Sequence, residues 1–424
     1  MRLIRSQVGV LRAWSLPHDV AACARMSTPA RLGRSLLLCA AMMGLVGTAL
    51  AQSTMQGQVQ PQGRGEDPPQ EQARIQPQDQ AKDQAQAPSQ GVSAGKQAPA
   101  WQRVRLGRGD RHYDFPVYAN HDLSGDLRGI RQVVFIFHGL QRNGDHYFDA
   151  GQKLLAASGR DPAEILLLAP NYPGVPDQDK GFDGMPVWGT TDWAAGLDAR
   201  GAGFDLSSFA VIDDLMVWLT DRARMPELGT IIVAGHSAGG QLVQRYAALN
   251  RVDEGIRSSG LEVRYVVANP SSYLYFNALR PAGDRFADYD RALCPGYDDY
   301  RYGMQHMIPY AAGTNGQTLF KRYAYRAVTY LLGTADNDPN HRVIDKSCPA
   351  QAQGATRLAR GRAYMRYERV LAGKAARIHH LAYEVNGVGH DQAGMFGSTC
   401  GLMALFQADP PAGFAGASCG PYLF

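Results

Sequence analysis

The stretch TIIVAGHSAGGQLVQRYAAL, from Thr230 to Leu249, contains the pattern that decides the fold. Its first six residues are an apolar run typical of a buried strand, and its second half has the apolar spacing of a helix. Between them lies Gly-His-Ser-Ala-Gly, in which a glycine two residues on either side of Ser237 permits a sharp, strained turn. We therefore predict that Ser237 is a nucleophile and that the Ala238 amide donates to a developing oxyanion. The alternative is a glycine-lined turn that only packs a helix on a strand.

The rest of the chain from Trp101 alternates between apolar runs and helical patterns. The runs that predict further strands with both faces covered are 132–137, 164–170, 263–270, 327–333 and 381–385. Helices are expected after Ser207 and Ser208 and over about 355–372. This alternation predicts an α/β domain with a mostly parallel sheet flanked by helices. The segment 111–119, RHYDFPVYA, reads as an antiparallel edge strand.

A serine hydroxyl becomes a strong nucleophile only when a base removes its proton, so an imidazole oriented by a carboxylate should follow Ser237 in the chain. Asp336 comes just after the strand expected at 327–333, and His390 comes just after the one at 381–385. We predict Asp336 as the acid and His390 as the base, since both follow strand ends in the order Ser, acid, His. Asp338 is the alternative acid, unless it only shapes a turn with Pro339.

Other polar residues near these positions receive structural roles. His236 is expected to pack under the turn, and Asp391 is expected to cap the following helix. His379 and His380 precede the last predicted strand and are expected at the surface or at a strand edge. Arginines recur along the helix predicted at about 355–372, where the simplest interpretation is a solvated outer face. These arginines are Arg357, Arg360, Arg362, Arg366 and Arg369.

The loop after the strand at 132–137 reads His138-Gly139-Leu140-Gln141-Arg142-Asn143. Gly139 would let the backbone approach a substrate, and the amide of Leu140 is the candidate for the second oxyanion-hole donor. Arg142, Asn143 and Tyr147 are expected to brace this loop, and a contact with substrate is the other possibility for them. A simple turn is the alternative for the whole segment.

Four motifs resemble the serine hydrolases of the α/β-hydrolase fold, in a secreted branch with esterases, feruloyl esterases and polyhydroxyalkanoate depolymerase-like proteins. They are VVFIFHGLQRN, GHSAGGQ, LLGTADNDPN and VGHDQAGMF, and the resemblance covers about residues 131–406. It implies an eight-stranded sheet and the site Ser237, Asp336 and His390, with Leu140 and Ala238 as the oxyanion hole. HGLQRN departs from the lipase-like branch, which has a run of glycines there.

The resulting expectation is an exported serine hydrolase that cleaves carboxylic esters, small or polymeric, through an acyl-enzyme. No metal or organic cofactor is required for this chemistry. The alternatives are an amide or peptide hydrolase with the same three residues and a catalytically silent binding protein that keeps the fold. The chain has 43 Lys and Arg against 39 Asp and Glu, which is too balanced to indicate a nucleic-acid partner.

Two irregular stretches interrupt the alternation, at about 172–206 and 271–320, and insertions of this kind are commonly functional loops or lids. Their aromatic residues either line an acyl or polymer groove or are simply well packed. The aromatic residues singled out as candidates are Trp188 and Trp193 in the first insertion and Tyr273, Tyr275, Phe276, Tyr297, Tyr300 and Tyr302 in the second.

The N-terminal part has the composition of a targeting segment and a linker. Residues 1–51 read as a signal peptide, with a possible true start at Met26, because a positively charged flank precedes a short apolar run and a small-residue cleavage site. Residues 52–100 lack aromatic residues and are rich in Gln and Pro, which predicts a disordered linker. One domain over 101–424 follows, exported to the periplasm or secreted, without stable membrane insertion.

The cysteines agree with export. Of 6 cysteines, Cys23 and Cys39 would leave with the signal peptide, and an even number remains. In an oxidising compartment this suggests two disulfides. We favour Cys294 with Cys348 and Cys400 with Cys419, and four free thiols are the alternative. No Cys-x-x-Cys spacing is present, so a cysteine metal site is not expected.

Overall fold

The computed structural model describes residues 101–373 and 377–422. The signal peptide predicted over 1–51, with its possible start at Met26, and the linker predicted over 52–100 lie outside the described residues. Within those two ranges, no helix has both the length and the apolar character needed to cross a lipid bilayer.

The core of the described chain is one nine-stranded sheet with the order β1-β2-β4-β3-β5-β6-β9-β10-β11. Six neighbouring strands in its middle run parallel, while β1, β2 and β11 are antiparallel to their neighbours. The strands are β1 (Gln102–Arg108), β2 (Arg111–Ala119), β3 (Gln132–Phe137), β4 (Ile165–Pro170), β5 (Thr230–His236), β6 (Glu262–Ala268), β9 (Ala327–Gly333), β10 (His380–Val385) and β11 (Cys419–Pro421).

The sheet has the parallel centre that the apolar runs predict, but its edges differ from the prediction. Eight strands were expected, and the segment 111–119 was expected at the edge. It is β2, and β1 covers its outer side. In β1 only Val104 and Leu106 are buried and they alternate with charged residues, so the strand has no continuous apolar run. The strand β11 has three residues, too few to show a period.

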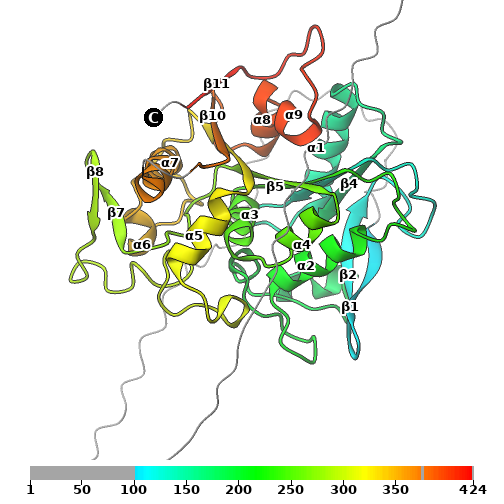
Figure 1. Cartoon of the computed structure of the whole chain (residues 1–424), viewed down its shortest axis with the longest axis horizontal. Helices are drawn as coiled ribbons and strands as arrows, with labels where there is room; N and C mark the ends of the chain where they lie inside the picture. The colour runs from blue at the N-terminus through cyan, green and yellow to red at the C-terminus, as the bar shows by residue number, and fades with distance from the viewer. Residues whose placement is uncertain (1–100, 374–376, 423–424) are drawn as a thin grey trace, which may run out of the picture. The chain divides into compact units, whose positions relative to one another are not determined.

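Helices cover both faces of the sheet because the side chains of each central strand alternate between two cores. In β3, Val133 and Phe135 belong to one core, and Val134 and Ile136 to the other. The first core is covered by α2 (Ser208–Leu219), α3 (Ala238–Leu249), α4 (Asp253–Ser258), α5 (Gly316–Ala324) and α7 (Arg357–Ala372). The second is covered by α1 (Gly144–Ala157), α8 (Gln392–Phe396) and α9 (Thr399–Phe406), which lie together in Figure 1.

Both helices that the sequence predicts most clearly have side-chain caps. Ser207 precedes α2 and its hydroxyl accepts a hydrogen bond from the amide of Phe209 at 3.1 Å. Thr356 precedes α7 and accepts from the amide of Ala359 at 3.1 Å. Each bond satisfies one of the amides that a first helical turn leaves without an intrahelical partner, which fixes where the helix begins.

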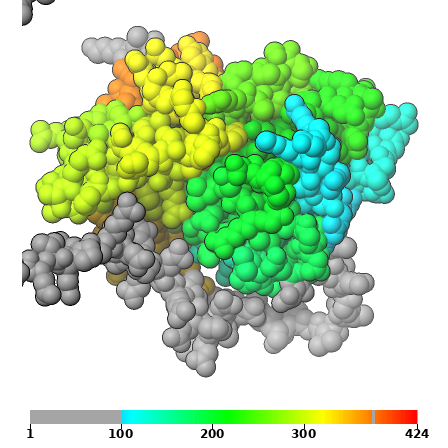
Figure 2. All heavy atoms as spheres, turned by 90° about the horizontal axis from the view of Figure 1, so that it is seen from below, coloured from blue at the N-terminus to red at the C-terminus, as the bar shows by residue number. Residues whose placement is uncertain are grey.

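The two insertions touch each other beside α3. The first contains the short 3-10 helices η2 (Val175–Lys180) and η3 (Trp193–Ala195), and the second contains the hairpin β7 (Leu279–Ala282) and β8 (Arg285–Asp288). The hydroxyl of Tyr300 donates to the carbonyl of Ala195 at 2.5 Å. Figure 2 shows the green part of the chain around residue 200 beside the lime and yellow part around 280–320.

Packing explains most of the aromatic residues in the insertions. Trp188 and Trp193 are fully buried, and of the six aromatic residues that the sequence analysis names in the second insertion only Tyr300 is partly exposed. Tyr273 stacks on Tyr364 of α7 with ring centroids 4.5 Å apart. These side chains therefore pack beneath the insertions and do not line an open groove.

Two disulfides join parts of the chain that the sheet leaves apart. Cys294 is bonded to Cys348, which links the second insertion to the four-residue helix α6 (Cys348–Gln351). Cys400 is bonded to Cys419, which links α9 to the edge strand β11. The structure thus has the pairing that the sequence favours.

Candidate active site

Ser237 lies at the turn between β5 and α3 in a conformation that few residues adopt. Its φ is +59°, in the region that strains a residue with a Cβ. The turn also needs both neighbouring glycines. A Cβ on Gly235 would lie 2.2 Å from the carbonyl oxygen of Gly239, and one on Gly239 would lie 2.4 Å from that of Phe137. The serine is consequently held at the carboxyl end of the sheet, where it stays partly exposed.

This turn and the sheet order together form the α/β-hydrolase fold. The central strands are parallel, so the loops after β3, β5, β9 and β10 all meet at one edge. The predicted site residues come from these loops.

The structure places Ser237, His390 and Asp336 in one hydrogen-bonded chain. Nε2 of His390 lies 2.8 Å from the hydroxyl oxygen of Ser237, and Nδ1 lies 2.8 Å from Oδ2 of Asp336. Because an ionised carboxylate only accepts, Nδ1 carries the hydrogen and Nε2 is left to accept from the serine hydroxyl. The arrangement can therefore move a proton from the serine to the imidazole.

Asp338 is not part of this chain. Its side chain is exposed, and Oδ1 accepts from the amide of Asn340 at 2.8 Å within a local turn. Asp336 is 4% exposed and sits at the end of β9, with its amide bonded to the carbonyl of Gly333. Of the two acids that the sequence offers, the structure brings Asp336 to the imidazole.

Arg357 lies beside the site, contrary to its predicted position. It was expected on a solvated helix face, but its side chain has 0% exposure and Nη1 donates to Oδ1 of Asp336 at 2.9 Å. Arg360 is buried as well, and its guanidinium donates to the carbonyls of Gly354 and Ser271. The interpretation fits Arg362, whose side chain is 41% exposed and pairs with Glu384. The helix is solvated on one side only, because the start of the second insertion covers the other.

Burial and the neighbouring charges set the protonation of the site. Burial raises the pKa of Asp336, but the hydrogen bond and charge of His390, with the charge of Arg357, outweigh it and lower that pKa below its usual range. Burial lowers the pKa of His390, and the positive charge of Arg357 adds to this effect against the opposing influence of Asp336. The net result is a neutral imidazole beside an ionised carboxylate at neutral pH.

The loop after β3 lies against the serine. Gly139 is so close that a Cβ there would be 3.8 Å from the Cβ of Ser237. His138 fixes the glycine carbonyl: its Nε2 accepts from the amide of Tyr172 at 3.0 Å, so Nδ1 donates to the oxygen of Gly139 at 2.8 Å. Burial lowers the pKa of His138 to about 4, which keeps this histidine neutral.

The amide of Ala238, next to the serine in the chain, and that of Leu140, next to Gly139, have no hydrogen-bond partner among the described residues. Ala238 is the first residue of α3, where amides lack intrahelical acceptors and the helix dipole is positive. These are the two amides that the sequence singles out as candidate oxyanion-hole donors.

The loop is braced as predicted at two of the three expected positions. Nε of Arg142 donates to Oδ2 of Asp177 at 2.5 Å, which ties the loop to the first insertion. The hydroxyl of Tyr147 lies against Gly139 of the loop, where a Cβ would be 2.8 Å from it, and 3.3 Å from Nδ1 of His236. Asn143 precedes α1 and makes no side-chain cap. His236 is buried, as expected, and Asp391 caps α8 by accepting from the amide of Gly394.

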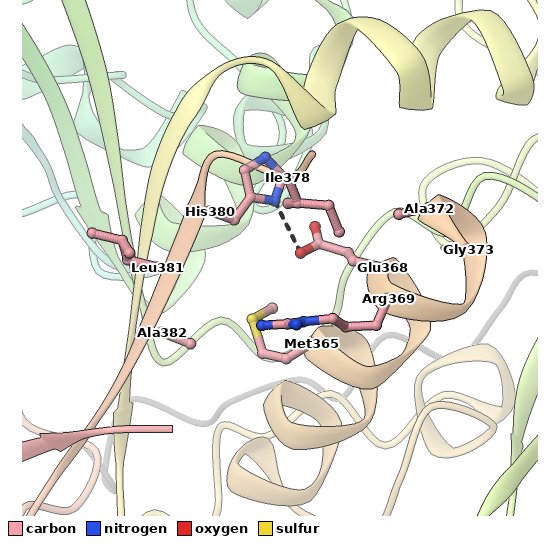
Figure 3. A pocket seen from close by; sticks show the side chains of 9 residues that line it. All are labelled: Met365, Glu368, Arg369, Ala372, Gly373, Ile378, His380, Leu381 and Ala382. Atoms are coloured by element: carbon pink, nitrogen blue, oxygen red, sulfur yellow. Dashed lines mark hydrogen bonds and ion pairs between the residues drawn. The ribbon is translucent and has the colours of Figure 1, made fainter. Parts of the chain in front are cut away.

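His380 lies at the start of strand β10, and of its two expected positions the surface is the one that the structure excludes. Its side chain is only 4% exposed, and Nδ1 bonds to Oε2 of Glu368 at 2.9 Å. Figure 3 shows this pair on the wall of a hollow between α7 and β10. Since His380 begins β10 and His390 follows its carboxyl end, the hollow lies at the opposite edge of the sheet from Ser237. It is not part of the site described above.

In the part of the chain that the structure describes, no group of three or more His, Cys, Asp or Glu side chains is arranged to hold a metal ion.

No protein-family model matches the sequence, and no curated protein matches it either. Among solved structures, the chain is similar to poly(aspartic acid) hydrolase-1 from Sphingomonas sp. KT-1, with 24% identity and a TM-score of 0.48 over 70% of this chain and 96% of that one. It is similar to LpqC, a poly(3-hydroxybutyrate) depolymerase from Bordetella parapertussis, with 22% identity and a TM-score of 0.49 over 74% and 92%. It is also similar to the siderophore hydrolase EstB from Aspergillus nidulans, with 14% identity and a TM-score of 0.38 over 74% and 97%.

Proposed function

We propose that this protein is a serine hydrolase that cleaves carboxylic esters through an acyl-enzyme. The observation that carries the proposal is the chain of two 2.8 Å contacts from Ser237 through His390 to Asp336. It is the arrangement that nucleophilic catalysis by serine requires, with the base oriented by a carboxylate and the nucleophile exposed.

The proposed reaction has two halves. His390 takes the hydroxyl proton at Nε2 while Oγ of Ser237 bonds to the ester carbonyl carbon, and the carbonyl oxygen becomes an oxyanion. The imidazolium then gives its proton to the alkoxide as the carbon–oxygen bond to the alcohol breaks. In the second half, water loses a proton to His390 and attacks the acyl-enzyme, and the proton returns to Oγ of Ser237 as the carboxylic acid leaves.

Asp336 and the two amides act without forming covalent bonds. Asp336 keeps the hydrogen of the imidazole on Nδ1 and stabilises the imidazolium that forms. The amides of Leu140 and Ala238 are the proposed donors to the oxyanion, and losing one such donor costs about 10² to 10³ in rate. Neither half of the reaction needs a metal or an organic cofactor.

The similar solved structures include hydrolases of polymers and of a siderophore, and the proposal takes small or polymeric esters as the substrate class. We propose export as well, with residues 1–51 as the signal peptide. The two disulfides are compatible with an oxidising compartment, whether periplasm or medium.

The test uses a fluorophosphonate probe and matched ester and amide substrates. The folded wild type is expected to be labelled and to hydrolyse the ester, and Ser237→Ala is expected to lose both properties. Ser258→Ala is the matched control, because Ser258 is exposed on α4 and its hydroxyl donates only to the carbonyl of Gly255. A wild type that is neither labelled nor active on esters would contradict the proposal. Cleavage of the amide at a comparable rate would replace the ester hydrolase by an amide hydrolase.

A further inference from the structure

Asp336 has two carboxylate oxygens, and the structure gives each of them a different partner. Oδ2 faces Nδ1 of His390, while Oδ1 accepts from Nη1 of Arg357 at 2.9 Å. Neither side chain of this second pair is open to solvent, with 0% exposure for Arg357 and 3% for Asp336. A Ser-His-Asp arrangement requires only the first contact, so the buried guanidinium is an additional component.

The guanidinium is fixed in place from several sides. Nε of Arg357 donates to the hydroxyl of Ser271 at 2.8 Å, and Nη2 lies 3.4 Å from Nδ1 of His341. The backbone joins the same residues, because the amide of Leu358 donates to the carbonyl of Asp336 at 3.1 Å. Arginine suits this position because its planar fork can serve several acceptors at once.

The buried positive charge of Arg357, next to the carboxylate of Asp336, changes how readily the imidazole of His390 takes up a proton. During acylation His390 becomes positively charged, and the carboxylate of Asp336 stabilises that charge. Arg357 already neutralises part of the carboxylate and repels the imidazolium, and little solvent lies between them to screen it. The site therefore gives up some stabilisation of the imidazolium, and its resting histidine is a weaker base.

We propose that Arg357 is a positioning residue of this hydrolase. It holds the carboxylate of Asp336 in place against His390, and its positive charge opposes protonation of His390. The enzyme therefore stays active at lower pH than it would without this charge. This inference rests on the proposed function. Arg357 acts through Asp336 and touches neither the reacting atoms nor the substrate.

Other titratable groups also face His390. The ring of His236 from β5 lies 4.7 Å from it between centroids, and the ring of His341 lies 5.3 Å away. Asp391, which caps α8, acts in the opposite direction and favours the protonated form. His236 is held neutral because burial lowers its pKa well below the usual range. Burial and the charge of Arg357 also lower the pKa of His341. Among these neighbours of His390, Arg357 therefore carries the one permanent positive charge.

The experiment is the pH profile of kcat/KM for a soluble acetate ester, followed in a pH-stat with the wild-type protein and its variants. The acid limb of this profile reports protonation of the base in the free enzyme. In the wild type we expect the limb below about 6.5, the ordinary value for histidine. Arg357→Gln should move the limb upward by about one pH unit, since it removes the buried positive charge held on the far oxygen of the carboxylate that faces the imidazole.

Two further variants separate charge from geometry. Arg357→Lys keeps the positive charge but loses the planar guanidinium that serves several acceptors. The plateau of kcat/KM should therefore fall, while the acid limb should stay at the pH of the wild type. His341→Ala should leave the limb where the wild type has it. Arg362→Gln is the matched control on the same helix, since Arg362 pairs with Glu384 at the surface and should change neither the limb nor the plateau.

Each outcome decides the inference. An unchanged limb in Arg357→Gln, or an equal shift in Arg357→Lys or His341→Ala, would overturn the role of the Arg357 charge while leaving the proposed function intact. If Arg357→Gln fails to fold, the wild-type limb still decides, because a limb at or above about 6.5 contradicts the inference. Full activity in Ser237→Ala would instead refute the proposed function.

Discussion

Replacing Asp336 by Asn should reduce kcat/KM at neutral pH by about 10³ or more, whereas Asp338→Asn should have little effect. In the wild type, Oδ2 of Asp336 lies 2.8 Å from Nδ1 of His390. Two unit charges roughly 4 Å apart, at an effective dielectric constant of about 20, interact by about 4 kcal/mol. That energy is lost when the imidazolium forms beside a neutral amide, and it corresponds to a factor of about 10³ in rate.

The value is a lower bound for two reasons given by the structure. Asn can present its NH₂ group to Nδ1, which then favours the wrong tautomer of His390. The charge of Arg357, 2.9 Å from the other oxygen, would also remain buried without its acid partner and would repel the imidazolium.

The assay is steady-state ester hydrolysis, with thermal unfolding measured for each protein. Leaving Arg357 unpaired should also destabilise the fold by about 3–5 kcal/mol, so activity must be compared well below the unfolding transition. Asp338→Asn is the control because the side chain of Asp338 is exposed and only caps a turn. The reasoning fails if Asp336→Asn keeps more than a tenth of the wild-type activity, or if Asp338→Asn abolishes turnover.

Three further predictions concern the framework of the site. Gly239→Ala should destabilise the protein by about 3 kcal/mol or more in chemical denaturation, because the new Cβ would lie 2.4 Å from the carbonyl oxygen of Phe137. Gly255→Ala is the control and should be neutral or stabilising, because a Cβ there would have no atom within 4 Å. Replacing Cys400 and Cys419 by Ser should cost about 3 kcal/mol for a sequence separation of 19, measured by unfolding in urea. The same change at Cys294 and Cys348, with a separation of 54, should cost about 4 kcal/mol. A larger loss of stability from removing the Cys400–Cys419 bond than from removing the Cys294–Cys348 bond would contradict the loop-entropy argument.

The elements that the sequence predicts best carry local signals. Strands such as β3, β4 and β5 are nearly continuous apolar runs, and Ser237, Asp336 and His390 each come within five residues after the end of a parallel strand. Because the carboxyl ends of parallel strands share one edge, their proximity could be anticipated from chain order alone. The pairing of β1 with β2 could not be predicted in this way, because β1 has only two buried apolar residues and depends on hydrogen bonds to β2 for the rest of its stability.

Arg357 shows why the environment of the site was harder to predict. Charge along a helix normally indicates a solvated face, and Arg362 follows that rule. Arg357 and Arg360 do not, because residues more than eighty positions earlier in the chain, at Ser271, cover their face of α7 and accept their hydrogen bonds. Tyr364 and Tyr367 are the available signal, because they follow Arg360 by four and seven residues and so share its face of α7, where both are buried.

The same helix limits how the second insertion can move. Besides the bonds of Arg357 and Arg360 to Ser271, the hydroxyl of Tyr364 donates to the carbonyl of Leu274 at 3.0 Å, and the amide of Phe276 donates to the hydroxyl of Tyr367 at 2.8 Å.

Every contact of this series is buried, and leaving one buried polar group unpaired costs about 1–3 kcal/mol. A lid motion hinged at residues 271–276 would break several of them together and would also pull on Asp336 through Arg357. The disulfide between Cys294 and Cys348 fastens the insertion a second time, close to the segment that leads into α7. The start of the insertion is therefore part of the scaffold that holds the acid, and any opening for substrate must come from the residues beyond it.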